Sequence, residues 1–231
     1  MKKLLTVTAV LMAAALIFTG CKNAANSDDG GEDLPGTWTS DAEVFEKYKD
    51  HPGRKITVTD KTVTFTCTPS EVESSDVPSQ GFYSYPYSFT TESIYTGFKV
   101  SASGSSSKSG CGLLFCGQDV GDNSWSGYKL LLDYDGFMLE QIDEGKYSDI
   151  TTNWVTNSAI KKEPAANDVT IYTDSDSNIV IKINGTKVYT LKNPTYKKGW
   201  IGFTANIAKD DVTAGKTVTQ KYVFKEFQTA K

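Results

Sequence analysis

Apolar residues recur at every second position in several segments of this chain, and this alternation constrains the fold more than any other feature. Residues 56–68, ITVTDKTVTFTCT, alternate apolar residues with threonine on both sides of a turn near Asp60-Lys61. The segment SIYTGFKVSASG repeats the alternation, with Ile94, Phe98, Val100 and Ala102 on one side. Because strand side chains point to opposite faces in turn, this pattern predicts half-buried β-strands.

Two dipeptides mark sharp turns between apolar runs. Asp135-Gly136 interrupts YKLLLDYDGFMLEQID, and Asn184-Gly185 interrupts IVIKINGTKVYTL. Both dipeptides tolerate the positive φ angles of type I′ turns, so they predict β-hairpins. Helical periodicity is nearly absent, and only residues 41–50, DAEVFEKYKD, predict a short helix. We therefore predict an all-β fold, an antiparallel two-sheet sandwich.

The N-terminus has the pattern of a signal peptide. Lys2 and Lys3 precede an apolar run over residues 4–18, which is too short for a membrane span of roughly 20 residues. Phe18-Thr19-Gly20-Cys21 then resembles the bacterial lipobox, in which the leader is cut before a cysteine that receives lipid. This resemblance predicts a lipoprotein signal peptide at residues 1–20 and a membrane anchor on Cys21.

The next segment is polar and predicts a tether. Residues 21–35 contain no large apolar residue before Leu34, so they cannot bury enough surface to offset the entropy of ordering. Residues 36–231 then form one predicted β-sandwich domain. Lys22 stands where lipoproteins held at an inner membrane commonly have aspartate, so we expect a bacterial cell envelope location at the outer membrane or cell surface.

The charge of the chain argues against nucleic acid as a partner. The formal net charge is −4, and loss of Lys2 and Lys3 with a leader would remove two positive charges and give −6. An acidic chain without a basic stripe lacks the electrostatic footprint of a nucleic-acid-binding protein.

The order of the predicted strands resembles a known fold family. The segments that carry this resemblance are, in order, SGCGLLF, GYKLLLDYDGFMLEQI, the hairpin at Ile183-Asn184-Gly185, KKGWIGF and a closing VFKEF. The chain resembles the concanavalin A-like lectin/glucanase jelly roll, most closely its laminin-G-like bacterial members. The resemblance covers about residues 83–228. It implies a jelly-roll sandwich, and it leaves function to be argued from a site.

The catalytic motif of the glucanase members is broken in this sequence. Those enzymes place Glu-x-Asp-x-Glu on one strand, because a retaining mechanism needs two carboxyl groups about 5–5.5 Å apart. The corresponding residues here are Glu140-Gln141-Ile142-Asp143-Glu144, which as a strand puts Glu140 and Glu144 on one face with Ile142 between them. We interpret these acids as exposed residues that close a hairpin, and we assign no catalytic residue.

Other chemistry is sparse. His51, the only histidine, lies in a polar turn, which leaves no histidine-dependent triad. Asp174-Ser175-Asp176-Ser177-Asn178 imitates the start of an EF-hand loop, but Ile179 and Gly185 stand where that motif needs glycine and glutamate. We interpret this segment as a hairpin tip and assign no metal ligand or cofactor, although lectin-like members often bind calcium near such loops.

Two interpretations of the remaining cysteines stay open. Cys111 and Cys116 lie on opposite faces of a regular strand, some 17 Å apart, which is beyond disulfide reach. Cys67 could pair with either of them and leave one thiol free. The alternative is that all three are buried apolar residues.

Aromatic residues are the candidates for ligand binding. Tyr83, Tyr85 and Tyr87 share one face of a strand, where they could stack on sugar rings or pack in the core. Trp125 lies in GDNSWSGY, a predicted loop without apolar neighbours, so it either binds ligand or folds back onto the sheet. Trp38, Trp154 and Trp200 lie within strand patterns and are predicted core residues.

Three functions follow from these features. The first is an envelope lipoprotein that binds carbohydrate or another surface ligand without catalysis. The second is a glycan-cleaving enzyme whose acids come from separate strands. The third is a structural envelope protein that binds a protein partner. Two carboxyl groups across a cleft would favour the enzyme, whereas an aromatic platform without them would favour the binding protein.

Overall fold

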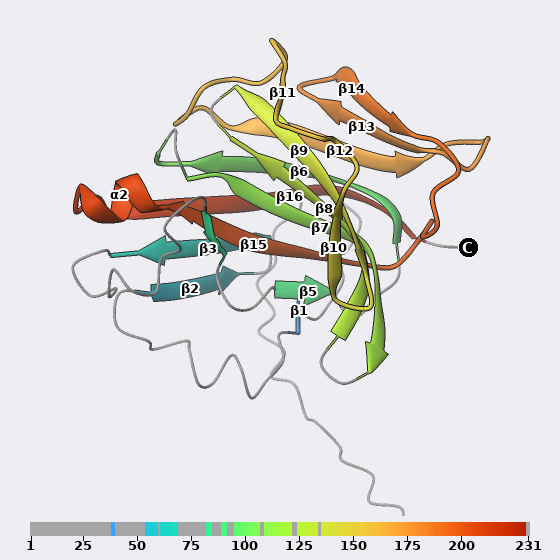
Figure 1. Ribbon diagram of the computed structural model, residues 1–231, viewed down its shortest axis with the longest axis horizontal. Coiled ribbons are helices and arrows are strands. Elements are labelled where there is room, and N and C mark those ends of the chain that lie inside the picture. The colour runs from blue at the N-terminus through green and yellow to red at the C-terminus, as the bar shows by residue number, and fades with distance from the viewer. Residues whose placement is uncertain are drawn as a thin grey trace, which may run out of the picture. The chain divides into compact units, whose positions relative to one another are not determined.

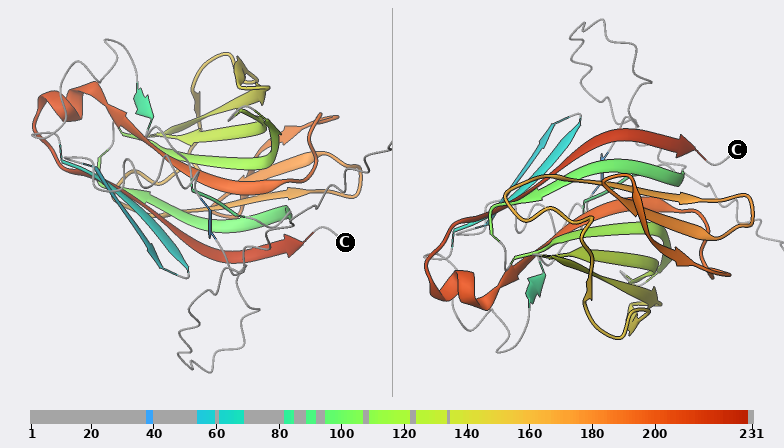
Figure 2. Two further views of the ribbon diagram at one scale, coloured as in Figure 1. Left: turned by 90° about the horizontal axis from the view of Figure 1, so that it is seen from below. Right: turned by 90° about the horizontal axis from the view of Figure 1, so that it is seen from above.

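The computed structural model describes residues 38–39, 54–59, 61–68, 82–84, 89–91, 95–106, 109–121, 124–133 and 135–229. Within these residues the chain forms two antiparallel sheets packed face to face (Figure 1; Figure 2). The predicted all-β sandwich is therefore confirmed. The predicted signal peptide, lipidated Cys21, tether and residues 41–50 lie outside the described residues.

The larger sheet, called the front sheet here, has nine described strands. In spatial order they are β1 (Trp38–Thr39), β5 (Phe89–Thr91), β15 (Trp200–Ala208), β7 (Cys111–Gly121), β8 (Ser124–Leu132), β9 (Gly136–Asp143) and β10 (Lys146–Asp149), with β11 (Val155–Thr156) beside β9 and β4 (Phe82–Ser84) beside β15.

The second sheet, called the back sheet, has seven described strands. In spatial order they are β14 (Thr186–Leu191), β13 (Ile179–Ile183), β12 (Asn167–Thr173), β6 (Tyr95–Gly104), β16 (Val218–Thr229), β3 (Thr62–Cys67) and β2 (Arg54–Thr59). The strands β6 and β16 are neighbours at its centre although they are far apart in sequence (Figure 1).

The two turn dipeptides have different roles. Asn184 and Gly185 have φ angles of 50° and 82° and close the β13–β14 hairpin, as the sequence predicts. Gly136 instead begins β9 and has no positive φ. It lies beside β11, where an added Cβ would come within 3.2 Å of the Val155 carbonyl oxygen. Glycine at this position allows the backbone of β11 to approach closely. The β8–β9 hairpin forms as predicted, but the predicted type I′ turn at Asp135-Gly136 is wrong.

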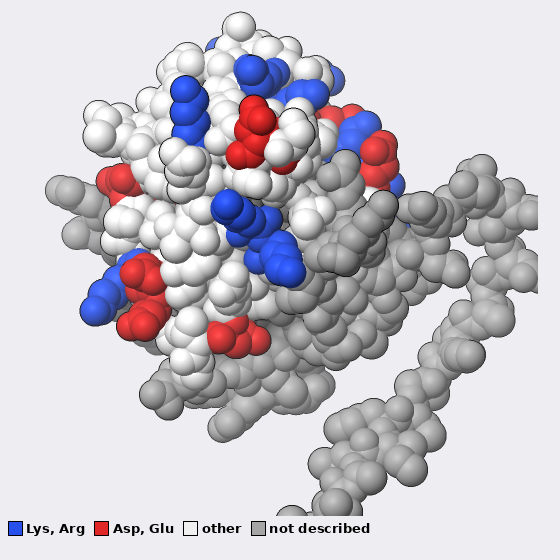
Figure 3. All heavy atoms as spheres, turned by 90° about the vertical axis from the view of Figure 1, so that its right-hand side faces the viewer, with Lys and Arg blue, Asp and Glu red and all other residues white. Residues whose placement is uncertain are grey.

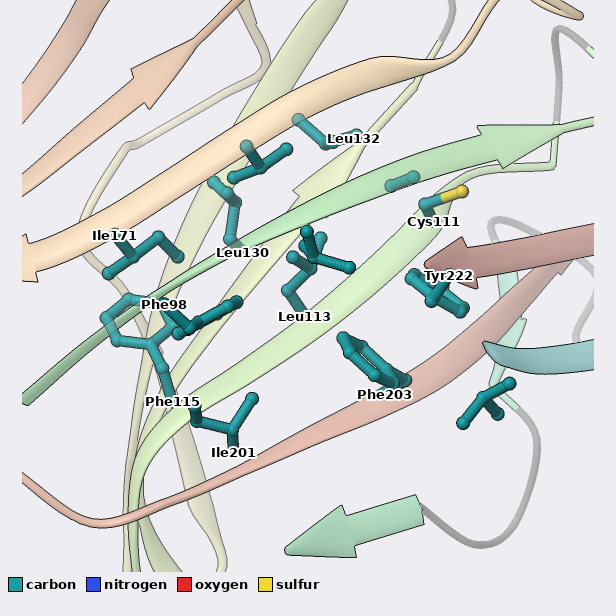
Figure 4. Close-up of a cluster of buried hydrophobic side chains, with 14 of the residues drawn as sticks. Phe98, Cys111, Leu113, Phe115, Leu130, Leu132, Ile171, Ile201, Phe203 and Tyr222 are labelled. Atoms are coloured by element: carbon teal, nitrogen blue, oxygen red, sulfur yellow. The ribbon is translucent and has the colours of Figure 1, made fainter. Parts of the chain in front are cut away.

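The core lies between the two sheets. Leu113, Phe115 and Leu130 of the front sheet face Phe98 and Ile171 of the back sheet (Figure 4). The Phe203 and Tyr222 rings stack with centroids 4.4 Å apart and planes 8° from parallel. The Tyr222 hydroxyl donates a hydrogen bond to the Thr204 carbonyl oxygen at 2.7 Å and accepts one from the Gly112 N–H at 2.8 Å, so this buried ring has partners for its polar end.

The three described cysteines are buried and free, which confirms the apolar interpretation over a disulfide. Cys116 joins Cys111 in the core cluster despite the odd spacing. The reason is a bulge: Cys116 has a φ of 53°, and the β7–β8 register shifts between Phe115 and Gln118. Burial raises the pKa of the Cys116 thiol to about 12, so it is not a reactive thiolate.

One short helix, α2 (Lys209–Thr213), follows β15 and was not predicted. The carboxylate of Asp211 anchors it by accepting hydrogen bonds from the hydroxyls of Ser106 and Ser109, at 2.5 Å and 2.6 Å. In the described part of the chain, no helix has the length and apolar character needed to span a membrane.

Candidate functional site

Trp125 lies in β8 rather than in the predicted loop. It is half-buried, its Cα partner on β7 is Asp119, and its ring centroid is 5.0 Å from that of Trp200. The residue therefore folds back onto the sheet while keeping part of its surface in solvent. Its role in binding stays a prediction.

Trp200 fixes the position of the Trp125 ring. It is buried at the start of β15, and it packs over Gly117, where an added Cβ would collide with the indole ring. The indole N–H of Trp200 donates a hydrogen bond to Asp119 Oδ1 at 3.2 Å. The next residue, Ile201, belongs to the core cluster, so Trp200 lies on the face of the front sheet turned away from the back sheet. We call this the outer face.

A charged pair occupies the same outer face. Leu130 and Leu139 are paired in register and point into the core, so their neighbours Lys129 and Glu140 point outward. Lys129 Nζ lies 3.6 Å from Glu140 Oε2, and the two side chains are only 10% and 13% exposed. Burial lowers the pKa of Lys129, an effect that the negative charge of Glu140 opposes.

Tyr147 covers this pair. It belongs to the edge strand β10, its ring centroid is 5.7 Å from Lys129 Nζ, and 58% of the residue is exposed. Its register partner on β9 is Ile142, which is on the outer face. An exposed tyrosine ring over a lysine gives this end of the sheet both apolar and hydrogen-bonding surface.

The turn between β9 and β10 holds these strands against β8. Glu144 and Gly145 have φ angles of 49° and 77°, which is a type I′ turn. The Gly145 N–H donates to the Trp125 carbonyl oxygen at 3.0 Å, and the Glu144 N–H donates to the Ser126 hydroxyl at 2.9 Å. The backbone that carries Trp125 is therefore tied directly to the β10 hairpin.

These residues form one surface, which we call the outer-face site. Its members are Asp119, Trp125, Lys129, Glu140, Tyr147 and Trp200. Farther along the same face Leu114 and Leu131 are buried, whereas all four residues of β10 are exposed. Ile142, the partner of Tyr147, is fully buried too, so the exposed surface at this end comes from β10 itself and in part from Trp125.

The acidic residues do not form the catalytic row of the glucanases. Glu144 is in the turn and not on a strand, so it does not share a strand face with Glu140. Glu140 is not the exposed acid that we predicted, because it is largely buried beside Lys129. Asp143 and Glu144 are exposed at the hairpin end, as predicted. Asp149 is the Cα partner of Glu140, so one further carboxyl group lies opposite it on the neighbouring strand.

No metal site is evident among the described residues, where no group of three or more histidine, cysteine, aspartate or glutamate side chains has metal-binding geometry. The EF-hand-like segment is a hairpin tip between Thr173 and Ile179. Asp174 Oδ1 accepts the backbone N–H groups of Asp176 and Asn178 at 3.0 Å and 2.8 Å, so the carboxylate stabilises the turn itself.

The predicted tyrosine row is only partly described. Tyr83 lies in β4, with Ile207 of β15 as its Cα partner, but its side chain lies outside the described part of the structure. Tyr85 and Tyr87 lie outside the described residues altogether. Their assignment to a binding site stays a prediction.

Charges of both signs are interspersed on the surface. On the face shown in Figure 3, the basic and acidic side chains of the described residues alternate among uncharged ones and do not form a stripe of one sign.

Sequence reasoning missed Lys129, Tyr147 and Asp119 as site residues. Lys129 stands within the apolar run YKLLL, and a lysine there is a signal because lysine is seldom buried without a partner. Tyr147 lies in the strand after the Glu144-Gly145 turn. The sequence interpretation placed Glu144 in the preceding strand, so it did not predict this turn or the strand that follows it. Asp119 had no signal in the sequence, since its role depends on the position of Trp200.

Comparisons with solved structures identify the fold. A native glycosidic hydrolase is 16% identical over 84% of this chain and 90% of that one, with a TM-score of 0.52. A lichenase from a mouse hindgut metagenome is 12% identical over 86% of this chain and 98% of that one, also at 0.52. The β-glucanase of Bacillus licheniformis is 9% identical over 76% and 82%, at 0.50. No protein-family model matches the chain, and no curated protein matches it significantly.

The chain therefore has the concanavalin A-like jelly-roll fold that its sequence resembles. At these identities the likeness concerns the fold, and a fold hosts many functions. Function has to be argued from the outer-face site.

Proposed function

We propose that this protein is a lipid-anchored bacterial envelope protein that binds carbohydrate at the outer-face site without cleaving it. One observation carries the proposal: an exposed tyrosine and a half-buried tryptophan flank a charged pair on a rigid sheet face. Sugar rings have apolar faces and hydroxyl edges, so aromatic rings beside fixed polar groups are the chemistry that recognises them.

The rigidity of the platform supports binding. Trp125 is held by Trp200, whose own ring is fixed over Gly117 and by its hydrogen bond to Asp119. The β9–β10 turn is held to β8 by two hydrogen bonds. A surface whose side chains are already in place loses little conformational entropy when a ligand arrives, and this favours affinity.

The arrangement of acids favours binding over hydrolysis. Glu140 is neutralised by Lys129 rather than paired with a second acid on its own strand. A retaining hydrolase needs two carboxyl groups about 5–5.5 Å apart, and an inverting one about 6.5–9.5 Å, with a substrate between or above them.

Glycan hydrolysis is the second candidate, and one observation favours it. The β9–β10 register places Asp149 opposite Glu140, which brings carboxyl groups from two separate strands to one face. If this pair is catalytic, Glu140→Gln and Asp149→Asn should each abolish cleavage of a glycan that the protein binds. Binding without any cleavage by the unmodified protein would leave the non-catalytic function standing.

Membrane anchoring rests on the N-terminal sequence. The lipobox-like residues before Cys21 and the polar residues 22–35 support a lipid anchor followed by a tether, which for a flexible chain of this length spans roughly 20 Å on average. Such a tether would hold the sandwich away from the bilayer, where it could reach a glycan of the envelope or of another surface.

A glycan array tests the proposed function. The full chain, solubilised in detergent, would be applied in parallel with Trp125→Ala and with Tyr172→Ala. We expect the unmodified protein to bind a defined set of glycans and Trp125→Ala to lose up to about tenfold in affinity, since an aromatic stacking contact is worth roughly 0.5–1.5 kcal/mol and about 1.4 kcal/mol is tenfold.

Tyr172→Ala is the matched control. Tyr172 lies in β12 of the back sheet and is half-buried like Trp125, with Lys182 Nζ 5.2 Å from its ring centroid, so it is an aromatic residue of similar exposure away from the outer-face site. Binding should be unchanged in this variant. Equal losses in both variants, or no glycan binding by the unmodified protein, would contradict a carbohydrate site on the outer face and favour a protein partner.

A further inference from the structure

The Lys129–Glu140 pair has hydrogen-bonding capacity that the fold does not use. Lys129 is only 8% exposed, and Glu140 Oε2 is buried with no hydrogen-bond partner. The distance of 3.6 Å from Lys129 Nζ to this oxygen is longer than the 2.7–2.9 Å of a charge-assisted hydrogen bond. A buried polar atom without a hydrogen-bond partner destabilises the folded state, and more so when it is charged.

The fold holds the pair in place despite this cost. The Cα atoms of Lys129 and Glu140 are register partners on β8 and β9, and the adjacent pair, Leu130 and Leu139, is fully buried in the core. Neither strand can move without disturbing that core contact. A buried polar atom that a rigid scaffold keeps unsatisfied needs an explanation, and a partner supplied by a bound ligand is the one that we pursue.

A ligand reaches the pair by displacing the ring of Tyr147. Tyr147 covers Lys129, and this tyrosine belongs to an edge strand whose residues are all exposed. Trp125 lies four residues before Lys129 on β8, which at about 3.3 Å per residue is roughly 13 Å along the strand. A ligand that contacts both residues must therefore be longer than one sugar ring.

We propose that Lys129 and Glu140 form a polar subsite that binds adjacent hydroxyl groups of an uncharged oligosaccharide whose other end stacks on Trp125. This inference rests on the proposed carbohydrate-binding function and assigns it a ligand class. A sugar hydroxyl both donates and accepts hydrogen bonds, so one hydroxyl accepts from the Lys129 ammonium while its neighbour donates to the Glu140 carboxylate. The two charges remain balanced while both gain hydrogen bonds.

The charges around the subsite select against anionic sugars. Lys129 is already neutralised by Glu140, and Asp119, Glu144 and Asp149 are exposed at the border of the outer-face site. Lys146 alternates to the opposite side of β10 from Tyr147. A uronic acid at this position would place a further negative charge among carboxylates, which costs binding free energy.

Calorimetric titration of the full chain in detergent tests the subsite. The uncharged probes are cellohexaose, laminarihexaose and β-1,4-mannohexaose. The charged probes are the hexamers of β-1,4-glucuronate and β-1,4-mannuronate, which differ from the first and third by a carboxylate on each ring. We expect at least one uncharged hexamer to bind, and both uronate hexamers to bind about tenfold more weakly than it or not at all.

The decisive variant replaces both charges together. Substituting a buried ion pair with apolar residues of similar size is often neutral or stabilising, so Lys129→Met combined with Glu140→Met should unfold at the same temperature or higher. The same double variant should bind the uncharged hexamer at least about tenfold more weakly, because hydrogen bonds to charged groups are worth roughly 1.5–3 kcal/mol. A purely structural pair would give no loss of affinity in a stable protein. Glu140→Gln is a second test variant, which removes the negative charge with minimal change in shape. It should also weaken binding of the uncharged hexamer.

The outcomes separate this subsite from the proposed function. If Trp125→Ala loses binding while the double variant and Glu140→Gln retain it, the subsite is wrong and carbohydrate binding stands. If the uronate hexamers bind more tightly than the uncharged ones, the assigned ligand class is wrong. If no hexamer binds and the array is also blank, the proposed function itself fails and the subsite fails with it.

Discussion

The carboxyl group of Glu163 occupies the space beside Gly104, which is free because glycine has no side chain. A Cβ at Gly104 would collide with Glu163 Oε1, and Glu163 Oε2 is buried with no hydrogen-bond partner. Burial is the largest cause that raises the pKa of this carboxyl to about 8, and the nearby charges of Asp133 and Asp211 contribute to the same shift. The protonated form is therefore the one that the folded chain accommodates at neutral pH.

This residue predicts a pH dependence of stability. The ordinary pKa is 4.5 and the folded value is about 8, so between these values the folded chain binds more protons than the unfolded chain. The contribution of Glu163 to stability is complete below about pH 4.5 and is lost as the pH rises through 8, with a slope of at most about 1.4 kcal/mol per pH unit.

Urea unfolding at several pH values between 5 and 8.5 would measure this slope. Glu163→Gln should flatten the dependence, because the amide fits the same space and does not titrate. Glu226→Gln is a suitable control, since Glu226 is exposed and contacts Lys99 at 3.4 Å. An unchanged slope in Glu163→Gln would show that another group is responsible.

Single residues of the outer-face site could be predicted only in part. Trp125 was recognised because an aromatic ring among polar neighbours lacks an obvious structural role. Lys129 and Glu140 acquire their meaning only when β8 and β9 are placed in register, since the two residues are 11 positions apart in sequence. The distance and burial that define the pair depend on tertiary structure, which no local pattern contains.

At the scale of elements, alternation predicted those strands that have one exposed face. The β2–β3 hairpin forms as expected because its strands present apolar residues to one side. The β13–β14 hairpin also forms as expected, but there the Asn184-Gly185 turn is the signal, since Ile179, Val180 and Ile181 of β13 are all buried. In β15 every residue is buried, and in β7 the first seven are. Apolar and small residues follow one another in these strands without alternation. The sequence pattern therefore does not show which face of β7 and β15 belongs to the outer-face site.

The β9–β10 turn gives a prediction at the same scale. Gly145 has a φ of 77°, and an added Cβ would lie 2.7 Å from the Ser124 hydroxyl at the start of β8. Gly145→Ala should lower the free energy of unfolding by about 1–2 kcal/mol from the left-handed backbone alone, with a further loss from the contact. Because the Gly145 N–H bonds the Trp125 carbonyl oxygen, glycan affinity should fall as well.

Gly215→Ala separates the two causes. Gly215 has a φ of 65° and open space around it, so its substitution carries the backbone strain without a steric contact. Chemical unfolding and glycan titration of both variants would measure the difference. If Gly145→Ala matches Gly215→Ala in stability and retains full affinity, the turn does not position Trp125.

At the scale of the whole molecule, the proposed binding site and the proposed anchor lie in separate parts of the sequence. The outer-face site is built entirely by strands β7, β8, β9, β10 and β15 of the front sheet. The predicted signals for export and lipid attachment lie in residues 1–21, before any described strand. The binding surface and the anchor can therefore be altered independently, which makes each of them testable without changing the other.

The anchor gives the last prediction. If Cys21 carries the lipid, Cys21→Ala should move the protein from the membrane fraction to the soluble fraction, because each buried acyl CH₂ contributes about 0.8 kcal/mol of membrane affinity and the variant has no chain to bury. Cys67→Ala, which changes a buried cysteine of β3, should leave the protein in the membrane fraction. The released Cys21→Ala protein should bind glycans with unchanged affinity, since the outer-face site lies in other residues. Retention of Cys21→Ala in the membrane fraction would show that something other than a lipid on this cysteine holds the protein there.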